Sequence, residues 1–256
     1  MPEKFIINGG RPLKGEIEVR GAKNAAFPIL AASLLTTEVC EISNLPLIED
    51  VFRMLEIMKS MGSQISWKGE RTVIIENKRL DLSKVREDLI SLLRGSVLFL
   101  GPLLARFGKV NFPRPGGCVI GARPIDTHLD GFKQLGVNIT QKGKKYLFKK
   151  SRAKSGQVIL NEFSVTATEN LILFASSLPG RTTIKIADGD YQVRELAKFL
   201  NKMGAHIKGA GTHEITVGGR SKLRGVRHRF MNDPVEAGTF ILIAAATRGN
   251  VLVNNV

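Results

Sequence analysis

Cys118 lies in a glycine-rich segment that could make its thiol a proton donor. Residues 113–126 read PRPGGCVIGARPID, so glycines stand on both sides of the cysteine. This composition predicts a mobile loop with an exposed thiol, directly after a strand at 109–112. The charges of Arg114 and Arg123 would stabilise the thiolate and make the thiol proton transferable. We therefore interpret Cys118 as a general acid.

Lys23 and Asn24 form a second group of residues that could take part in chemistry. They lie at the start of an apolar helix predicted over 24–35. They directly follow a turn at Gly21. The first turn of a helix leaves backbone N–H groups unpaired and carries a partial positive charge, so a lysine placed there suits an anion. The alternative is a lysine that is merely solvated.

The other cysteine and the histidines indicate structural roles. Cys40 falls in an apolar strand at 39–42, where a small buried hydrophobe is expected. Two cysteines cannot build a disulfide framework or a cysteine metal cluster, which is typical of a reducing compartment. The four histidines lack metal-ligand spacing, and the side chains of Asp126 and Asp130 are expected to point away from His128. Fingerprints for dinucleotides are absent as well, so we predict neither a metal nor a cofactor.

The net charge of +15 over 256 residues raises the question of an anionic partner. The basic residues are dispersed and only 6% of residues are aromatic, which argues against nucleic acid. A solvated surface, a phosphate-bearing substrate and a nucleic-acid surface all stay open at this point. The first ten residues contain no apolar signal region, and the apolar run at 97–105 is too short to cross a bilayer. We expect a cytoplasmic protein that does not enter the membrane.

The elements that must position these residues repeat along the chain. An apolar helix, a one-residue break and a strand occur four times, with breaks spaced 71, 72 and 69 residues apart. A period of about seventy residues marks a repeated supersecondary unit. The first three units continue with a second helix, a glycine stop and another strand. The break residues are Thr37, Gly108, Gly180 and Gly249, and the glycine stops are Gly62, Gly136 and Gly204.

These repeats predict an α/β protein with two unequal parts. Residues 22–230 hold three complete units, which we expect to form one domain. A fourth unit begins after them and stops at Val256 with its first half. We therefore predict that residues 1–21 and 231–256 are fragments of a second, incomplete domain.

Four motifs resemble the UDP-N-acetylglucosamine 1-carboxyvinyltransferase family, whose members are enolpyruvyl transferases related to EPSP synthase. The cysteine loop is the most specific of them, since EPSP synthase shares the fold but not this loop. The resemblance implies inside-out α/β barrel domains, each built of three repeats around buried helices. The motifs are GAKN at 21–24, PGGC at 115–118, GARPID at 121–126 and ATEN at 167–170.

The resemblance also implies a reaction and its residues. The enolpyruvyl group of phosphoenolpyruvate would pass to the 3-hydroxyl of UDP-N-acetylglucosamine with loss of phosphate, without metal or cofactor. Cys118 would donate the proton, while Lys23 and Arg123 would neutralise phosphate charge during catalysis. The implied substrate-binding residues are Lys23, Asn24, Arg94, Arg123, Pro124, Ile125, Asp126, Thr127, Ser164 and Val165.

The chain departs from the family pattern at several positions. Thr166 replaces a usual glycine, and where the family has an acidic stretch, residues 185–192 keep only Asp190 in kind. The resemblance places a catalytic aspartate and further arginines beyond Val256. We therefore expect this chain to bind UDP-N-acetylglucosamine weakly and not to turn it over. A noncatalytic UDP-sugar-binding protein and a nucleic-acid-binding protein stay open as alternatives.

Overall fold

The computed structural model describes residues 4–116 and 124–256, so Cys118 and Arg123 lie outside the described residues. Each repeat contains an inner helix, a strand, a second helix and a hairpin. The first has α1 Lys23–Ser33, β2 Cys40–Ser43, α2 Glu49–Ser60, β3 Gln64–Trp67 and β4 Thr72–Glu76. The second has η2 Arg94–Phe99, α4 Leu100–Phe107, β5 Lys109–Pro113, α5 Asp126–Gln134, β6 Asn138–Lys142 and β7 Lys145–Lys149. The third has α6 Val165–Ala175, β9 Arg181–Lys185, α7 Tyr191–Met203, β10 His206–Lys208 and β11 Glu214–Gly218.

Connecting and flanking elements complete the described chain. The connecting ones are η1 Leu82–Lys84, α3 Glu87–Leu92, β8 Gln157–Ile159 and β12 Arg227–Arg229. The flanking ones are β1 Lys14–Glu18, α8 Pro234–Ala246 and β13 Asn250–Asn254. Among the described residues, no helix is long and apolar enough to cross a membrane.

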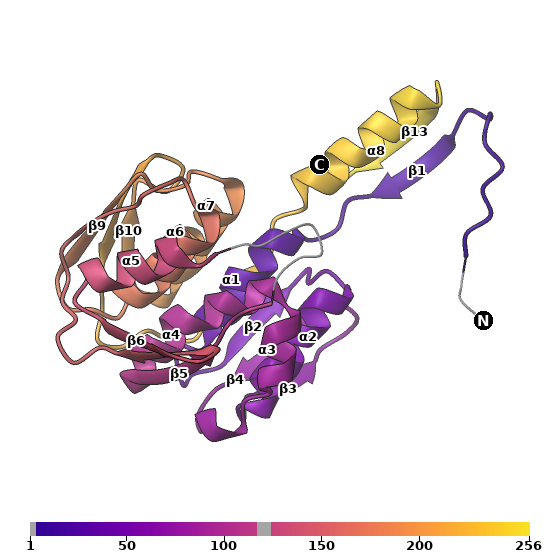
Figure 1. Cartoon of the computed structure of the whole chain (residues 1–256). Coiled ribbons are helices and arrows are strands. Elements are labelled where there is room, and N and C mark those ends of the chain that lie inside the picture. Colours follow the sequence, from indigo (N-terminus) through magenta and orange to yellow (C-terminus); the bar gives the residue numbers. More distant parts are fainter. Residues whose placement is uncertain (1–3, 117–123) are drawn as a thin grey trace.

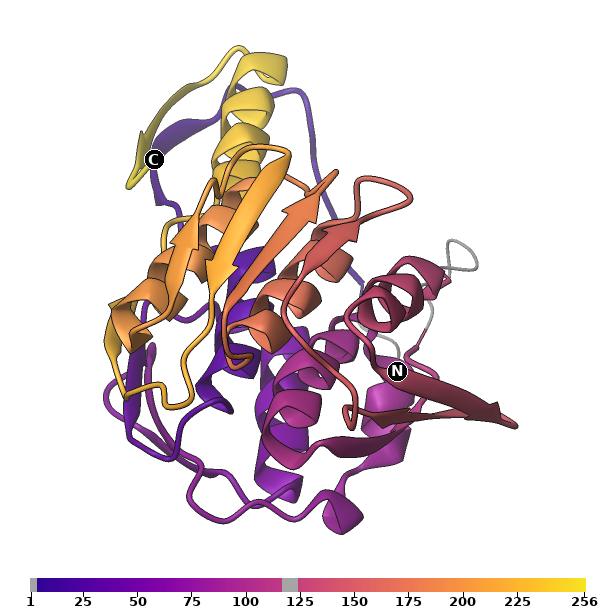
Figure 2. The ribbon, with the colours of Figure 1, turned by 90° about the vertical axis from the view of Figure 1, so that its left-hand side faces the viewer.

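Each repeat contributes one sheet to the outside of the body. The strand orders are β12-β2-β4-β3, β5-β7-β6 and β8-β9-β11-β10. Within each sheet the hairpin strands pair antiparallel, whereas β12 joins β2 and β8 joins β9 in parallel. Figure 2 shows the third sheet standing in front of helices α6 and α7. Sheets outside and helices inside give the inside-out arrangement that the sequence predicts.

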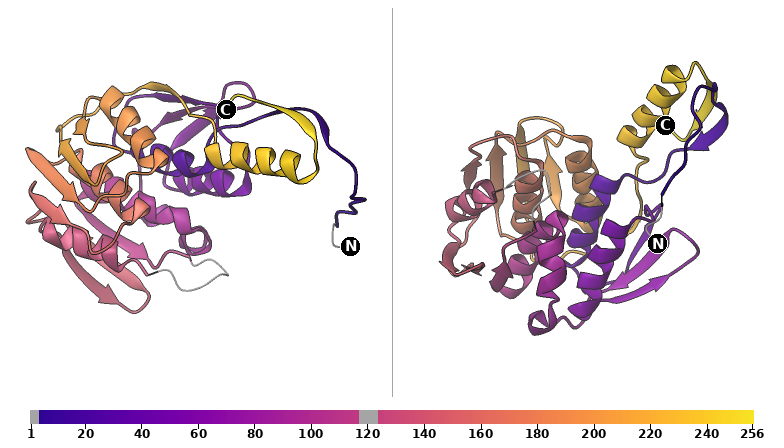
Figure 3. Two further views of the ribbon diagram at one scale, coloured as in Figure 1. Left: turned by 90° about the horizontal axis from the view of Figure 1, so that it is seen from above. Right: turned by 45° about the vertical axis from the view of Figure 1, so that its right-hand side comes forward.

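The inner helices α1, α4 and α6 form the core between the sheets (Figure 3). Their apolar residues are buried nearly all round, which is the pattern expected of a helix enclosed on every side. Helix α8 is just as apolar but stands away from the body with β1 and β13 (Figure 1). Its Ile241 and Leu242 side chains are 52% and 70% exposed.

Two chain segments cross side by side where α8 and β1 leave the body. Gly21 forms an antiparallel bridge with Asn232, the Ala22 N–H donates to the Met231 carbonyl at 3.0 Å, and the Asp233 N–H donates to the Arg20 carbonyl at 2.8 Å. A side chain at position 21 would overlap the Asn44 carbonyl, so only glycine lets this segment pack against the backbone of Asn44. We call 20–23 and 231–233 the crossing segments.

One element differs from the sequence prediction. The repeat predicts one apolar helix before each break, but before Gly108 the structure has 3₁₀ helix η2 followed by α4. The side-chain amide of Asn170, from α6, explains the change. Its oxygen accepts the Gly101 N–H at 2.8 Å and its nitrogen donates to the Val97 carbonyl at 2.9 Å. These are the two groups that an uninterrupted helix would have joined to each other.

Candidate functional site

Lys23 starts α1 at the crossing segments. Its backbone N–H donates to the Asp233 carboxylate at 3.1 Å, which fixes the first turn of the helix. Its ammonium pairs with Asp50 at 2.6 Å and lies 5.9 Å from the centre of the Phe27 ring. The lysine side chain remains 45% exposed, so its charge is accessible to an anion.

Phe27 also brings Arg94 to the same place. A Cβ at Gly95 would come within 2.7 Å of the Phe27 ring, so the glycine lets η2 pack directly on α1. Arg94 therefore begins η2 beside the first turn of α1. Its guanidinium donates to the Pro124 carbonyl at 2.9 Å, which ties η2 to the segment that leads into α5.

The start of α5 adjoins the start of α6. Thr127, which is buried, donates its hydroxyl hydrogen to Glu162 at 2.7 Å, just before α6. Ile125 is buried, whereas Pro124 and Asp126 are exposed. The predicted nucleotide-side segment thus has two side chains that hold it in place and two that face solvent.

A buried histidine holds α5 against α6. The Asn170 amide can only donate to His128 Nδ1, at 3.0 Å, so the ring proton sits on Nε2 and is donated to the Thr166 hydroxyl at 3.1 Å. Burial, and then the charge of Arg94, lowers the pKa of His128 to about 3, so the ring is neutral. Thr166, where the family pattern has glycine, is therefore the hydrogen-bond partner of His128. Ser164 and Val165, half-buried at the start of α6, lie next to this contact.

Carboxyl groups gather on the α7 side of α1. The Glu169 side chain is fully enclosed, and burial, followed by the charges of Asp190 and Asp188, raises its pKa well above the ordinary value. Burial and the charge of Asp233 raise the pKa of Tyr191 to about 12, although the Asn24 amide lowers it in part. Asn24, which is itself exposed, thus lies between the lysine and this acidic group.

The described site therefore has two electrostatic flanks. Lys23 and Arg94 offer positive charge for phosphate, while Asp190 and Asp233 can accept hydrogen bonds from hydroxyl groups. The ends of the cysteine segment are fixed nearby. The Gly116 N–H donates to the Ile90 carbonyl at 3.2 Å, and Pro124 holds Arg94. The described residues contain no cluster of three or more metal-ligating side chains.

Sequence reasoning missed several residues of this neighbourhood. Glu162, His128 and Tyr191 hold the helix starts, but each finds its partner in a different repeat, and the repeat period does not reveal such contacts. The signal that could have identified Thr166 was its departure from the family pattern. A residue that replaces glycine next to a binding segment needs a partner of its own.

We expect iodoacetamide to modify Cys118 well before Cys40. Cys40 is fully buried in β2, and burial raises its pKa to about 11, so little thiolate exists near neutral pH. Peptide mapping after brief labelling at pH 7.5 measures both sites. A Cys40→Ala variant should label as fast as the parent chain, and preferential labelling of Cys40 would contradict the assignment.

The chain is similar to known proteins over nearly its whole length. The family model described as EPSP synthase (3-phosphoshikimate 1-carboxyvinyltransferase) matches residues 7–256. UDP-N-acetylglucosamine 1-carboxyvinyltransferase 1 of Carboxydothermus hydrogenoformans is 43% identical over 99% of this chain and 60% of its own length. The protein named UDP-N-acetylglucosamine 1-carboxyvinyltransferase from Coxiella burnetii is 42% identical over 99% of this chain and 59% of its own length. The chain thus spans about 60% of the length of these curated relatives.

Solved structures share the fold. The enolpyruvyl transferase NikO from Streptomyces tendae superposes with a TM-score of 0.80 at 22% identity, covering 92% of this chain and 56% of that one. EPSP synthase from Acinetobacter baumannii gives a TM-score of 0.69 at 17% identity, covering 98% and 57%. At these identities the likeness concerns the fold alone, and it confirms the predicted fold class.

Proposed function

Because this chain belongs to the EPSP synthase family, we propose that its protein transfers the enolpyruvyl group of phosphoenolpyruvate to the 3-hydroxyl of UDP-N-acetylglucosamine. The names of relatives at 42–43% identity support this acceptor over 3-phosphoshikimate. The reaction is the first committed step of peptidoglycan synthesis. We accordingly place the protein in the cytoplasm, with a role in cell-wall formation, cell shape and division.

The observation that carries the proposal is the convergence of helix starts from all three repeats. Lys23 opens α1, Arg94 opens η2 and contacts Pro124 before α5, and Ser164 precedes α6. Each start offers backbone N–H groups and partial positive charge to one region. A ligand with several phosphates and a uridine fits such a region better than a single-charge ligand does.

The proposed chemistry uses the two flanks differently. The sugar 3-hydroxyl gives its proton to the aspartate that the resemblance places beyond Val256, and its oxygen forms a bond to C2 of phosphoenolpyruvate while Cys118 supplies a proton to C3. The C2–O bond to phosphate then breaks with its electron pair leaving on the phosphate, and C3 returns a proton to the Cys118 thiolate, which gives the enolpyruvyl ether and free phosphate. Lys23, Arg94 and Arg123 stabilise the phosphate charge that develops. Cys118 and Arg123 enter this scheme from the sequence, because they lie outside the described residues.

The nucleotide and uridine contacts complete the proposed site. We assign the nucleotide side to Pro124, Ile125, Asp126 and Thr127, and the uridine side to Ser164 and Val165. Asn24, between the two flanks, would contact the sugar.

We also propose that residues 22–230 form one domain and that residues 1–21 and 231–256 belong to a second. The exposed apolar side chains of α8 support this division, since the equivalent helices α1, α4 and α6 bury theirs. Further polypeptide that covers α8 would supply the second wall of the site.

Calorimetric titration tests the proposed acceptor. We expect UDP-N-acetylglucosamine to bind the 256-residue chain and 3-phosphoshikimate not to bind, because Lys23, Arg94 and the α5 and α6 starts form an extended nucleotide site. Phosphate release from phosphoenolpyruvate by the full-length protein tests the transfer. Binding of 3-phosphoshikimate alone would refute the acceptor, and sugar-nucleotide binding without release by the full-length protein would favour a noncatalytic UDP-sugar-binding protein.

A further inference from the structure

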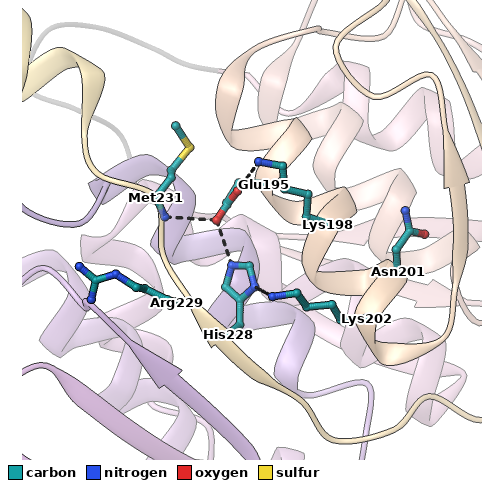
Figure 4. Close-up of a pocket in the computed structure, with 7 residues that line it drawn as sticks. All are labelled: Glu195, Lys198, Asn201, Lys202, His228, Arg229 and Met231. Carbon is teal, nitrogen blue, oxygen red and sulfur yellow. Dashed lines mark hydrogen bonds and ion pairs between the residues drawn. The ribbon is translucent and has the colours of Figure 1, made fainter. Parts of the chain in front are cut away.

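A buried pair of hydrogen-bonded side chains, a histidine and a glutamate, lies behind the crossing segments, away from the substrate residues. Glu195 on α7 and His228 on β12 line an open hollow together with Lys198 and Lys202 (Figure 4). The side chains of Glu195 and His228 are only 4% and 3% exposed. The proposed reaction uses neither of them.

The hydrogen bonds of this pair have definite directions. The Lys202 ammonium can only donate, so it donates to His228 Nδ1 at 3.3 Å and the ring proton sits on Nε2. That proton is donated to Glu195 Oε1 at 2.9 Å. The rings of Phe199 and Phe230 pack edge-on against His228. Glu195 is therefore held from one side by a ring that is packed between two phenylalanines.

The same carboxylate oxygen holds a crossing segment. Glu195 Oε1 accepts the Met231 N–H at 3.2 Å, and the Met231 carbonyl accepts the Ala22 N–H at 3.0 Å. Lys23 is the next residue. A continuous set of hydrogen bonds thus runs from His228 to the backbone directly before the lysine that faces the substrate side.

The charge of Glu195 persists despite its burial. Burial raises the pKa of its carboxyl, but the hydrogen bond from His228, together with the charge of Lys198, outweighs this and leaves the pKa below its ordinary value. An ionised carboxylate is a stronger acceptor than a neutral group. The hold on Met231 therefore exists at neutral pH.

We propose that Glu195 and His228 are positioning residues, which set the crossing segments and through them the place of Lys23. The inference rests on the proposed function, because that function supplies the ligand of Lys23. Neither residue touches substrate in this proposal. They act through Met231 and Ala22 alone.

Three variants separate position from charge. Glu195→Met keeps side-chain length and loses the acceptor, so UDP-N-acetylglucosamine should bind about tenfold more weakly, a difference of about 1.4 kcal/mol. Glu195→Gln retains an oxygen at the place of Oε1, so its affinity should stay within about twofold of the parent, a difference of about 0.4 kcal/mol. Lys198→Ala removes only the ammonium 3.4 Å from Oε2, 69% exposed in the parent, and serves as the matched control with no change expected.

Two further measurements distinguish positioning from general weakening. In a Lys23→Ala background, Glu195→Met should weaken binding no further, because the affected contact is already gone. Hydrogen exchange at the Ala22 amide should accelerate at least about tenfold in Glu195→Met and stay slow in Glu195→Gln. If Glu195→Met does not fold, the Glu195→Gln variant still tests the inference, because a tenfold loss of affinity or faster exchange at Ala22 in that variant would contradict it.

Several results would overturn the inference. A tenfold loss in Glu195→Gln would show that charge matters and position does not. If Glu195→Met weakens binding further in the Lys23→Ala background, or leaves the affinity of the parent chain unchanged, then Glu195 does not act on binding through Lys23. If Lys23→Ala itself leaves the affinity unchanged, the proposed ligand role of Lys23 fails, whereas Ala22 exchange still tests the hold of Glu195.

Discussion

Replacing Asn170 by alanine should lower the free energy of unfolding by about 3 to 5 kcal/mol, because three buried polar groups lose their partner at once. Those groups are the Gly101 N–H, the Val97 carbonyl and His128 Nδ1. The lost hydrogen bonds join α6 to η2, α4 and α5, so the substitution weakens contacts between repeats. Urea unfolding followed by circular dichroism measures the effect.

Ser176→Ala is the matched control for this prediction. Ser176 is equally buried and directly follows α6, but its hydroxyl donates only to the Ile172 carbonyl of the same helix. Its loss should cost about 1 kcal/mol or less. Equal effects of the two substitutions would mean that Asn170 does not bridge the repeats.

Replacing Lys23 by alanine should weaken the binding of UDP-N-acetylglucosamine by about ten- to a hundredfold. A hydrogen bond from a charged donor to phosphate contributes about 1.5 to 3 kcal/mol, which corresponds to this range. The substitution spares the backbone N–H that Asp233 accepts, so the helix start should stay intact. Calorimetric titration at fixed ionic strength provides the measurement.

Lys68→Ala is the control for the lysine prediction. Lys68, which directly follows β3, is also an exposed lysine in an ion pair, with Glu41 of β2 at 3.2 Å. It removes the same net charge from a place remote from the helix starts. A comparable loss of affinity in both variants would show that the lower net charge, and not a contact made by Lys23, weakens binding.

The repeat architecture could be predicted because its signals are local. Apolar helices, a break and a strand recur at constant spacing, and glycines such as Gly108 and Gly204 end α4 and α7 with positive φ of 71° and 106°. A left-handed stop depends on one residue and its neighbours, so the sequence alone shows it. The burial of α1, α4 and α6 follows in the same way from helices that are apolar all round.

The contacts between repeats could not be predicted in this way. Asn170 reads as one polar residue in an apolar helix, and nothing local indicates that it interrupts another helix 69 residues away. Glu195 and His228 are 33 residues apart and look like ordinary surface residues of a helix and a basic strand. Their burial results from how β12 joins β2, which depends on the pairing of distant strands.

For the candidate site, the sequence placed Lys23 and Asn24 at a helix start and the family resemblance implied Arg94, and the structure brings Lys23 and Arg94 together around Phe27. Their functional roles stay predictions. The grouping of acidic side chains around Glu169 could not be predicted from the sequence. Only tertiary packing brings Glu169 close to Asp188 and Asp190. Residue type and spacing identify chemistry, but burial decides which protonation state a carboxyl adopts.

The parallel pairing of β1 with β13 gives the order of synthesis a physical consequence. β1 leaves the ribosome long before its partner, which emerges only when Asn250 has been made. β2 likewise waits for β12. Pairings between such distant segments form slowly, because the entropy cost of closing a long loop comes before any stabilising contact is made. A nascent chain that has not reached β12 therefore exposes open strand edges, and at these edges it is most prone to pair with another copy of itself.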